Sequence, residues 1–81
     1  MPRFFLDVFD GAQVSEDHGG LEFADLATAV AEATQGARDL VAEGIRKNED
    51  VSGQEFRIRD VDGRTVATVP FRDCLPGRLR G

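Results

Sequence analysis

Glu16, Asp17 and His18 are the residues whose types and spacing come nearest to chemistry, because carboxylate and imidazole groups bind metals and transfer protons. Three neighbours on one flexible loop converge poorly on a single ion, and the sequence holds no second cluster at metal-ligand spacing. We therefore expect a solvated acidic loop that binds no metal and no cofactor. Asp7 could serve a hydrolytic site, but a single acid on an exposed strand face is expected to be structural or solvating. Hydrolysis through Asp7, Asp17 and His18 is the least favoured function.

The remaining reactive residues do not form an active-site pattern. Asp60-Val61-Asp62-Gly63 resembles the start of a calcium loop, but counting back from the glycine required at position six makes Ile58 the first ligand, so the match fails. This segment is predicted to be a turn. Cys74 has only Arg72 nearby to activate its thiol, and the sequence has no serine elbow or glycine-rich phosphate loop. We expect no catalytic residues, and hence a protein that is not an enzyme.

The composition describes one small domain with an uneven charge. The 81 residues carry a formal charge of −5, with six acids against one Arg in residues 1–25 and six Arg against four acids in residues 54–81. This balance argues against general binding to nucleic acid or to anionic membranes. A single cysteine excludes an intrachain disulfide, and Asp7 and Asp10 interrupt the early apolar run, so no signal peptide is expected. No stretch is long enough to span a bilayer. We expect a cytoplasmic protein.

The element that must position these residues is a helix predicted over residues 25–47. Asp25 is a suitable N-cap, because its carboxylate can accept hydrogen bonds from amides of the first turn. Gly36 and Gly44 weaken the C-terminal half, so the end is expected between Gly44 and Asn48. Leu40 is expected to be buried against the layer that contains Phe56. The apolar face comprises Leu26, Val30, Ala33, Ala37, Leu40, Val41 and Gly44.

Two pairs of strands are predicted around this helix. Residues 3–9 form the first strand, and Asp10-Gly11 turns the chain into a returning strand at residues 12–15. Residues 16–20 form a polar loop, and residues 21–23 could add a few extended residues before the helix.

After the helix, residues 54–60 alternate between apolar and polar side chains, and a second two-residue turn is centred on Asp62-Gly63. Pro70 cannot donate to a ladder, so the last strand is expected to end there or to lie at an edge. The resulting register pairs Arg59 with Val66, Ile58 with Ala67 and Phe56 with Val69. The shared buried face then comprises Phe56, Ile58, Ala67, Val69 and Phe71.

The expected fold is therefore α+β, with two layers. A four-stranded antiparallel sheet in the order β-β-α-β-β carries one long helix on one face. Residues 1–75 form this single domain, and residues 76–81 form a flexible tail.

The first strand is apolar on both faces, which identifies a candidate interface. Phe4, Leu6 and Val8 can meet the helix, whereas Phe5 and Phe9 point to the opposite side. A loop or the C-terminal tail could cover these rings, the strand could be central and twisted, or the rings could form a self-association or partner surface. Basic side chains share this side and suit salt bridges to the acidic N-terminal half, within or between subunits. The candidate interface comprises Phe5, Phe9, Arg57 and Arg59.

Several short motifs resemble a family of short bacterial proteins of unknown function. Its members begin with an Arg-aromatic-Phe-Phe strand and carry a late Asp-Xaa-Asp/Glu-Gly turn, and the similarity covers about residues 2–72. The residue before the helix cap is often Pro in that family and is Ala24 here, and the Arg-rich segment after Phe71 is not a hallmark of it. The resemblance implies no established activity, cofactor or catalytic residue. It rests on Pro2-Arg3-Phe4-Phe5, Asp7, Asp10-Gly11, Asp17, Gly20, Glu22, Asp25-Leu26, Ala29, Asp60, Asp62 and Gly63.

A looser similarity is to antitoxins whose N-terminal domain is a partial ribonuclease-H-like fold. These also combine strands, an Asp-Gly turn, an acidic loop and an Ala-rich helix after a capping Asp, but their Pro-Asp-Leu-Pro-Gly-Cys segment is missing here. We expect a small interaction protein that forms a homodimer through its sheet. The alternative is an antitoxin-like or regulatory module whose acidic N-terminal half binds a basic protein partner.

Overall fold

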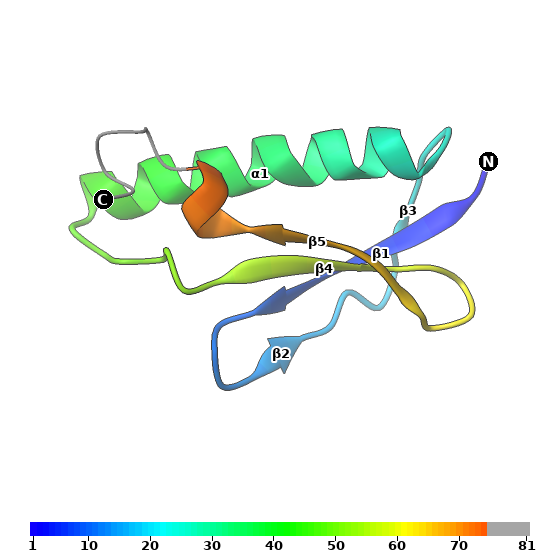
Figure 1. Ribbon diagram of the computed structural model, residues 1–81, viewed down its shortest axis with the longest axis horizontal. Helices are drawn as coiled ribbons and strands as arrows, with labels where there is room; N and C mark the ends of the chain where they lie inside the picture. Colours follow the sequence, from blue (N-terminus) through cyan, green and yellow to red (C-terminus); the bar gives the residue numbers. More distant parts are fainter. Residues whose placement is uncertain (75–81) are drawn as a thin grey trace.

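The computed structural model describes residues 1–74, which form an antiparallel sheet with one long helix across one face (Figure 1). The α+β class is confirmed, but the sheet has five strands and not four, because residues 21–22 add a strand of their own. The predicted boundary between the domain at 1–75 and the tail at 76–81 lies outside the described residues. The elements are β1 (Arg3–Phe9), β2 (Val14–Ser15), β3 (Leu21–Glu22), α1 (Leu26–Arg46), β4 (Glu55–Arg59), β5 (Thr65–Pro70) and the 3₁₀ helix η1 (Phe71–Cys74).

β1 is the central strand of the sheet, because three other strands pair with it. The strand order is β2-β1-β4-β5, with β3 also paired to β1. β4 pairs with β1 from Phe5 to Phe9 on one side. The other side is divided, since β3 pairs with Arg3 and Phe4 whereas β2 pairs with Val8 and Phe9. A strand that is apolar on both faces therefore occupies an interior position.

The hairpin of β4 and β5 keeps the predicted register in its middle and departs from it near the turn. Ile58 faces Ala67 and Phe56 faces Val69, as predicted, but Arg59 faces Thr65 and not Val66. The turn is longer than expected, because the Asp60 amide donates to the Arg64 carbonyl at 2.9 Å and Gly63 adopts a φ of 83°. A turn with three central residues, ending in a left-handed glycine, offsets the register by one. The register shift between Ile58 and Arg59 restores the pairing of the two apolar faces.

The first turn is also displaced from its predicted centre. The Asp10 amide donates to the Gln13 carbonyl at 3.1 Å, so Gly11 and Ala12 occupy the middle. The Asp10 carboxylate accepts hydrogen bonds from the amides of Ala12 and Gln13 and thereby stabilises the turn from its first position.

The ends of α1 follow local sequence signals. Asp25 is the N-cap, as predicted, and its Oδ1 accepts from the Thr28 amide at 2.8 Å. At the other end Asn48 adopts a φ of 57°, and the Glu49 amide donates to the Gly44 carbonyl at 2.7 Å. This is the left-handed termination in which two amides satisfy the last free carbonyls. A Cβ at Gly44 would lie 2.9 Å from the Glu49 carbonyl, so this close return of the chain favours glycine.

The core combines small side chains of α1 with large ones from the sheet. The fully buried stripe of the helix is Ala29, Ala33, Ala37, Val41 and Gly44. Opposite this stripe lie Phe4, Phe23, Ile58, Val69 and Phe71. The predicted burial of Phe71 is confirmed, although it belongs to η1, where its amide donates to the Gln54 carbonyl at 2.9 Å. None of the described helices is both long enough and apolar enough to cross a membrane.

The predicted burial of Leu40 is wrong, since 44% of its surface is exposed. The Phe56 ring lies 3.6 Å from the position that a Cβ on Gly36 would occupy, and it packs against Phe71 with ring centroids 5.1 Å apart. Gly36 thus lets the helix approach Phe56 closely, and Phe56 packs on Phe71 of η1.

Candidate functional site

The side of the sheet that faces away from α1 carries the residues predicted to form an interface. Residues directly opposite on paired strands share a face, so this open face consists of three rows across the sheet. The rows are Phe5, Arg59 and Thr65; Asp7, Arg57 and Thr68; and Val14, Phe9, Glu55 and Pro70. Phe5, Phe9, Arg57 and Arg59 thus lie on one surface.

Each aromatic ring of the open face lies beneath a guanidinium group. The Arg57 Cζ lies 4.0 Å from the centroid of the Phe9 ring, and the Arg59 Cζ lies 5.0 Å from that of Phe5. Both distances suit a cation–π contact, which favours arginine over other cations because its planar group can stack. Both rings are half-buried. The two pairs look alike in sequence, but their surroundings differ.

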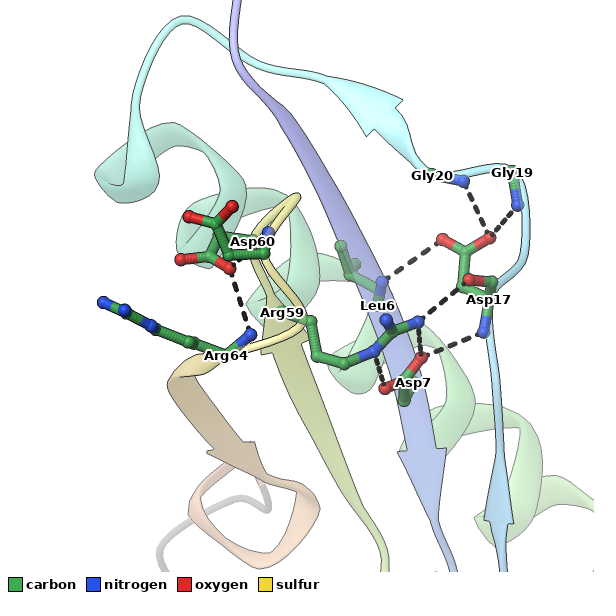
Figure 2. Close-up of polar contacts among 9 residues, drawn as sticks. Leu6, Asp7, Asp17, Gly19, Gly20, Arg59, Asp60 and Arg64 are labelled. Carbon is green, nitrogen blue, oxygen red and sulfur yellow. Dashed lines mark hydrogen bonds and ion pairs between the residues drawn. The ribbon is translucent and has the colours of Figure 1, made fainter.

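The half of the open face around Phe5, Asp7 and Arg59, called the Phe5 half, contains a largely buried ion pair. The Arg59 Nε lies 2.5 Å from Asp7 Oδ2, and its Nη2 lies 3.1 Å from Asp7 Oδ1 (Figure 2). Asp7 is only 4% exposed, and a carboxylate buried to that extent requires a charged partner. Of the two roles expected for Asp7, structural or solvating, its burial and its ion pair fit the structural one, although its strand face was expected to be exposed. Its partner lies 52 residues away in the chain, so no local signal indicated the pair.

Asp17 fastens the loop of residues 16–20 over this half of the face. Its Oδ2 accepts from the Leu6 amide at 3.2 Å, and its Oδ1 accepts from the amides of Gly19 and Gly20 at 3.2 and 3.0 Å (Figure 2). The Asp17 amide donates to Asp7 Oδ1 at 3.0 Å, and its carbonyl accepts from Arg59. Three of these hydrogen bonds join the loop to β1 and to β4, and the two from Gly19 and Gly20 close the loop on itself.

The expectation of a solvated acidic loop holds for Glu16 and His18, which are exposed, and is wrong for Asp17. A signal for this role was present in the sequence. An Asp followed two residues later by Gly-Gly often accepts hydrogen bonds from the backbone ahead of it. Among residues 1–74, no three His, Cys, Asp or Glu side chains come together as a metal site.

The ionisation of this cluster follows from its contacts. Burial raises the pKa of Asp7, but the hydrogen bonds from Arg59 and the Asp17 amide outweigh it, so the pKa lies below its ordinary value. The Gly20 amide holds the pKa of Asp17 below its ordinary value, supported by the amides of Leu6 and Gly19. Asp7 raises the pKa of Arg59. At neutral pH both acids are therefore ionised acceptors, which is unsuitable for a general acid.

The Phe9 half of the open face is more accessible. Arg57 Nε lies 2.7 Å from Glu55 Oε2, and these side chains are 37% and 26% exposed, against 24% and 6% for Arg59 and Asp7. Val14, which lies beside Phe9 on β2, is 43% exposed. Phe9, Val14, Glu55, Arg57 and Pro70 are called the uncovered patch below.

The acids of the N-terminal half are largely engaged by the chain itself. Four of them, Asp7, Asp10, Asp17 and Asp25, accept hydrogen bonds from backbone amides. Glu22 lies 3.4 Å from Arg3 in an exposed ion pair. These contacts stabilise turns, the helix cap and the loop, so the negative charge is spread over structural positions.

The reactive groups at the C-terminal end have structural surroundings. The Asp60 carboxylate accepts from the amide of Arg64 (Figure 2). It also accepts from the amide of Asp62, as expected for the predicted turn. Cys74 is half-buried and packs against the core, with its Sγ 4.0 Å from the Thr34 carbonyl.

A family model for a domain of unknown function, DUF6894, matches residues 3–72. The chain belongs to this family. The DUF6894 match runs from the start of β1 into η1 and so includes both halves of the open face. The predicted membership of a family of unknown function is confirmed, and the antitoxin similarity stays a prediction. Neither the curated proteins nor the solved structures gave a match.

Proposed function

We propose that this chain is a small non-enzymatic interaction protein that forms a homodimer through the uncovered patch. The observation that carries the proposal is that exposed Val14 and half-buried Phe9 lie beside an accessible ion pair on the sheet face that α1 leaves open. Sheets commonly pack face to face at about 10 Å, with side chains of both inner faces interdigitating. A second copy of this chain can supply such a face.

The charges of the patch suit a second copy. A two-fold contact pairs a surface with itself, so each charge must meet its opposite on the same surface. The patch contains both Arg57 and Glu55, and a dimer can place each Arg57 near the second copy's Glu55. Burial of a side chain such as Phe9 contributes about 1.5–3 kcal/mol, which must offset the lost freedom of the two chains. We therefore expect a weak dimer that dissociates on dilution.

Pairing through the edge of the sheet is the competing geometry, and β5 is poorly suited to it. β5 is the outer strand beside β4, but its pairing is interrupted near Thr65, and Pro70 lacks an amide donor. A shifted register and a proline are devices that blunt strand edges against pairing. The open face is therefore preferred over the edge.

The second candidate, a regulatory or antitoxin-like module that binds a basic protein through its acidic half, has less support. It needs a free acidic surface, whereas most acids of residues 1–25 already bind backbone amides or Arg3. The same hydrogen bonds support the non-enzymatic part of the proposal. They keep Asp7 and Asp17 as ionised acceptors, which is unsuitable for a general acid.

Sedimentation velocity over a range of concentrations tests the homodimer. We expect the parent to dimerise as its concentration rises and Phe9→Ser to remain monomeric with an unchanged circular dichroism spectrum. Arg57→Glu should weaken the dimer, and Glu55→Arg combined with Arg57→Glu should restore it. Val66→Ser, on the outer strand, is the matched control and should dimerise like the parent. A parent that stays monomeric at its highest soluble concentration contradicts the proposal.

A further inference from the structure

The loop of residues 16–20 lies directly against the Phe5 ring. A Cβ on Gly20 would stand 2.8 Å from Phe5 Cε2 and 2.9 Å from the Phe4 carbonyl, and Gly20 has a φ of 67°. Only glycine allows the backbone to lie this close in this conformation. The ring is therefore enclosed between Arg59 and the loop.

The Asp17 carboxylate supplies one of the bonds that hold the loop to β1, beside those from the Asp17 amide to Asp7 and from Arg3 to the Gly19 and Gly20 carbonyls. β3 pairs with β1 as far as Phe4, and β2 pairs with it from Val8 onward. Between these pairings the Leu6 amide donates to Asp17, so a side chain occupies the place of a strand (Figure 2). Side-chain attachment can be removed by one substitution, whereas a strand ladder cannot.

We propose that this loop is a built-in cover that keeps Phe5 out of intermolecular contact and confines association to the uncovered patch. The inference rests on the proposed function and adds a regulatory part to it. With the cover in place, the surface available to a second copy is the Phe9 half. With the cover released, the Phe5 ring becomes a second accessible apolar site on the open face, separated from Phe9 by Asp7, and assemblies larger than a dimer form.

Hydrogen exchange of the Leu6 amide and sedimentation of Asp17→Ala in the full chain together test the cover. Alternation along β1 directs the amides of Phe5 and Asp7 toward β4, so they serve as internal controls. We expect the Leu6 amide to exchange roughly tenfold faster or more in the variant, because its charged acceptor is gone. The Phe5 and Asp7 amides should be unaffected, and sedimentation should reveal species larger than those of the parent.

Two further variants make the outcome decisive. Asp17→Ala combined with Phe5→Ser should return the association to that of the parent, because the newly exposed ring is removed. Gly20→Ala pushes the loop off the ring while the Asp17 side chain is kept, and it replaces Asp17→Ala if that variant does not fold. Faster Leu6 exchange without larger species overturns the cover. Leu6 exchange equal to that of the parent also overturns it, since the loop is then held by other contacts.

The same measurements separate the cover from the homodimer. If the parent is a monomer and Phe9→Ser changes nothing, the proposed function fails. The cover survives that result only if Asp17→Ala produces association that Phe5→Ser abolishes. If the parent dimerises through Phe9 and Asp17→Ala adds no larger species, the homodimer stands and the cover fails.

Discussion

The two halves of the open face contain the same kinds of residue and differ in what surrounds them. In each half an arginine of β4 lies over a phenylalanine of β1 and pairs with an acid. Asp7 is buried and bound to Arg59 and to the loop, whereas Glu55 lies on the same strand as its partner Arg57 and remains accessible. A cation–π pair is therefore compatible with either a structural or an accessible surface. The acid beside it, and the segment that covers that acid, decide between the two.

Removal of the buried acid should give the largest effect. Asp7→Ala leaves Arg59 without its partner and the loop without one of its attachments, and because Arg59 is 24% exposed the loss should lie at or below the lower end of the about 3–5 kcal/mol typical of a buried ion pair. A small domain has a total stability of roughly 5–15 kcal/mol, so the unfolding midpoint in urea should fall steeply. An unchanged midpoint would show that the ion pair of Asp7 and Arg59 does not stabilise the Phe5 half.

Substitution of the two rings should separate stability from association. Phe5→Ser should lower the free energy of unfolding by about 2 kcal/mol, because the ring packs under the loop and Arg59. Phe9→Ser should lower it by about 1 kcal/mol or less and mainly abolish the proposed dimer. Chemical denaturation and sedimentation on both variants measure the two effects. Equal losses of stability would remove the distinction between the halves.

Acid should destabilise the Phe5 half of the open face more than the rest of the fold. The pKa values of Asp7 and Asp17 are lower in the folded state than their ordinary value of 3.8. Their ionised forms therefore stabilise the fold above that value, and the stabilisation is lost as the pH falls through the folded pKa values. We expect the Leu6 amide, followed by exchange, to lose protection in strongly acidic solution before the amides of α1. In Asp17→Asn this pH dependence should be smaller, and a parent without it contradicts the assignment.

The accessible ion pair should give the smallest effect. Glu55→Gln removes the charge that pairs with Arg57, and exposed pairs contribute only about 0–1 kcal/mol. Thermal unfolding should therefore be nearly unchanged, whereas the dimer should weaken and become less sensitive to salt. A large loss of stability would show that Glu55 stabilises the fold through its ion pair, as Asp7 does.

Local patterns in the sequence predicted the elements well. The Asp25 cap, the central register of β4 and β5, the buried Phe71 and the end of β5 at Pro70 all follow from neighbours in the chain. The sharing of one face by Phe5, Phe9, Arg57 and Arg59 also follows, because alternation along a strand is a local property.

The tertiary structure decided the features that depend on distant partners. Leu40 is exposed, and Phe56 packs instead against Gly36 and Phe71. β3 becomes a strand because β1 offers an edge near Phe4. Asp17 stabilises the fold because the Leu6 amide, 11 residues away, lacks a strand partner.

Helix caps and strand faces are set by interactions within a few residues, which the sequence alone determines. The difference between Asp7 and Glu55 depends on how much water remains around each carboxylate. That quantity is set only when the loop of residues 16–20 folds across β1 and Arg59 arrives from β4.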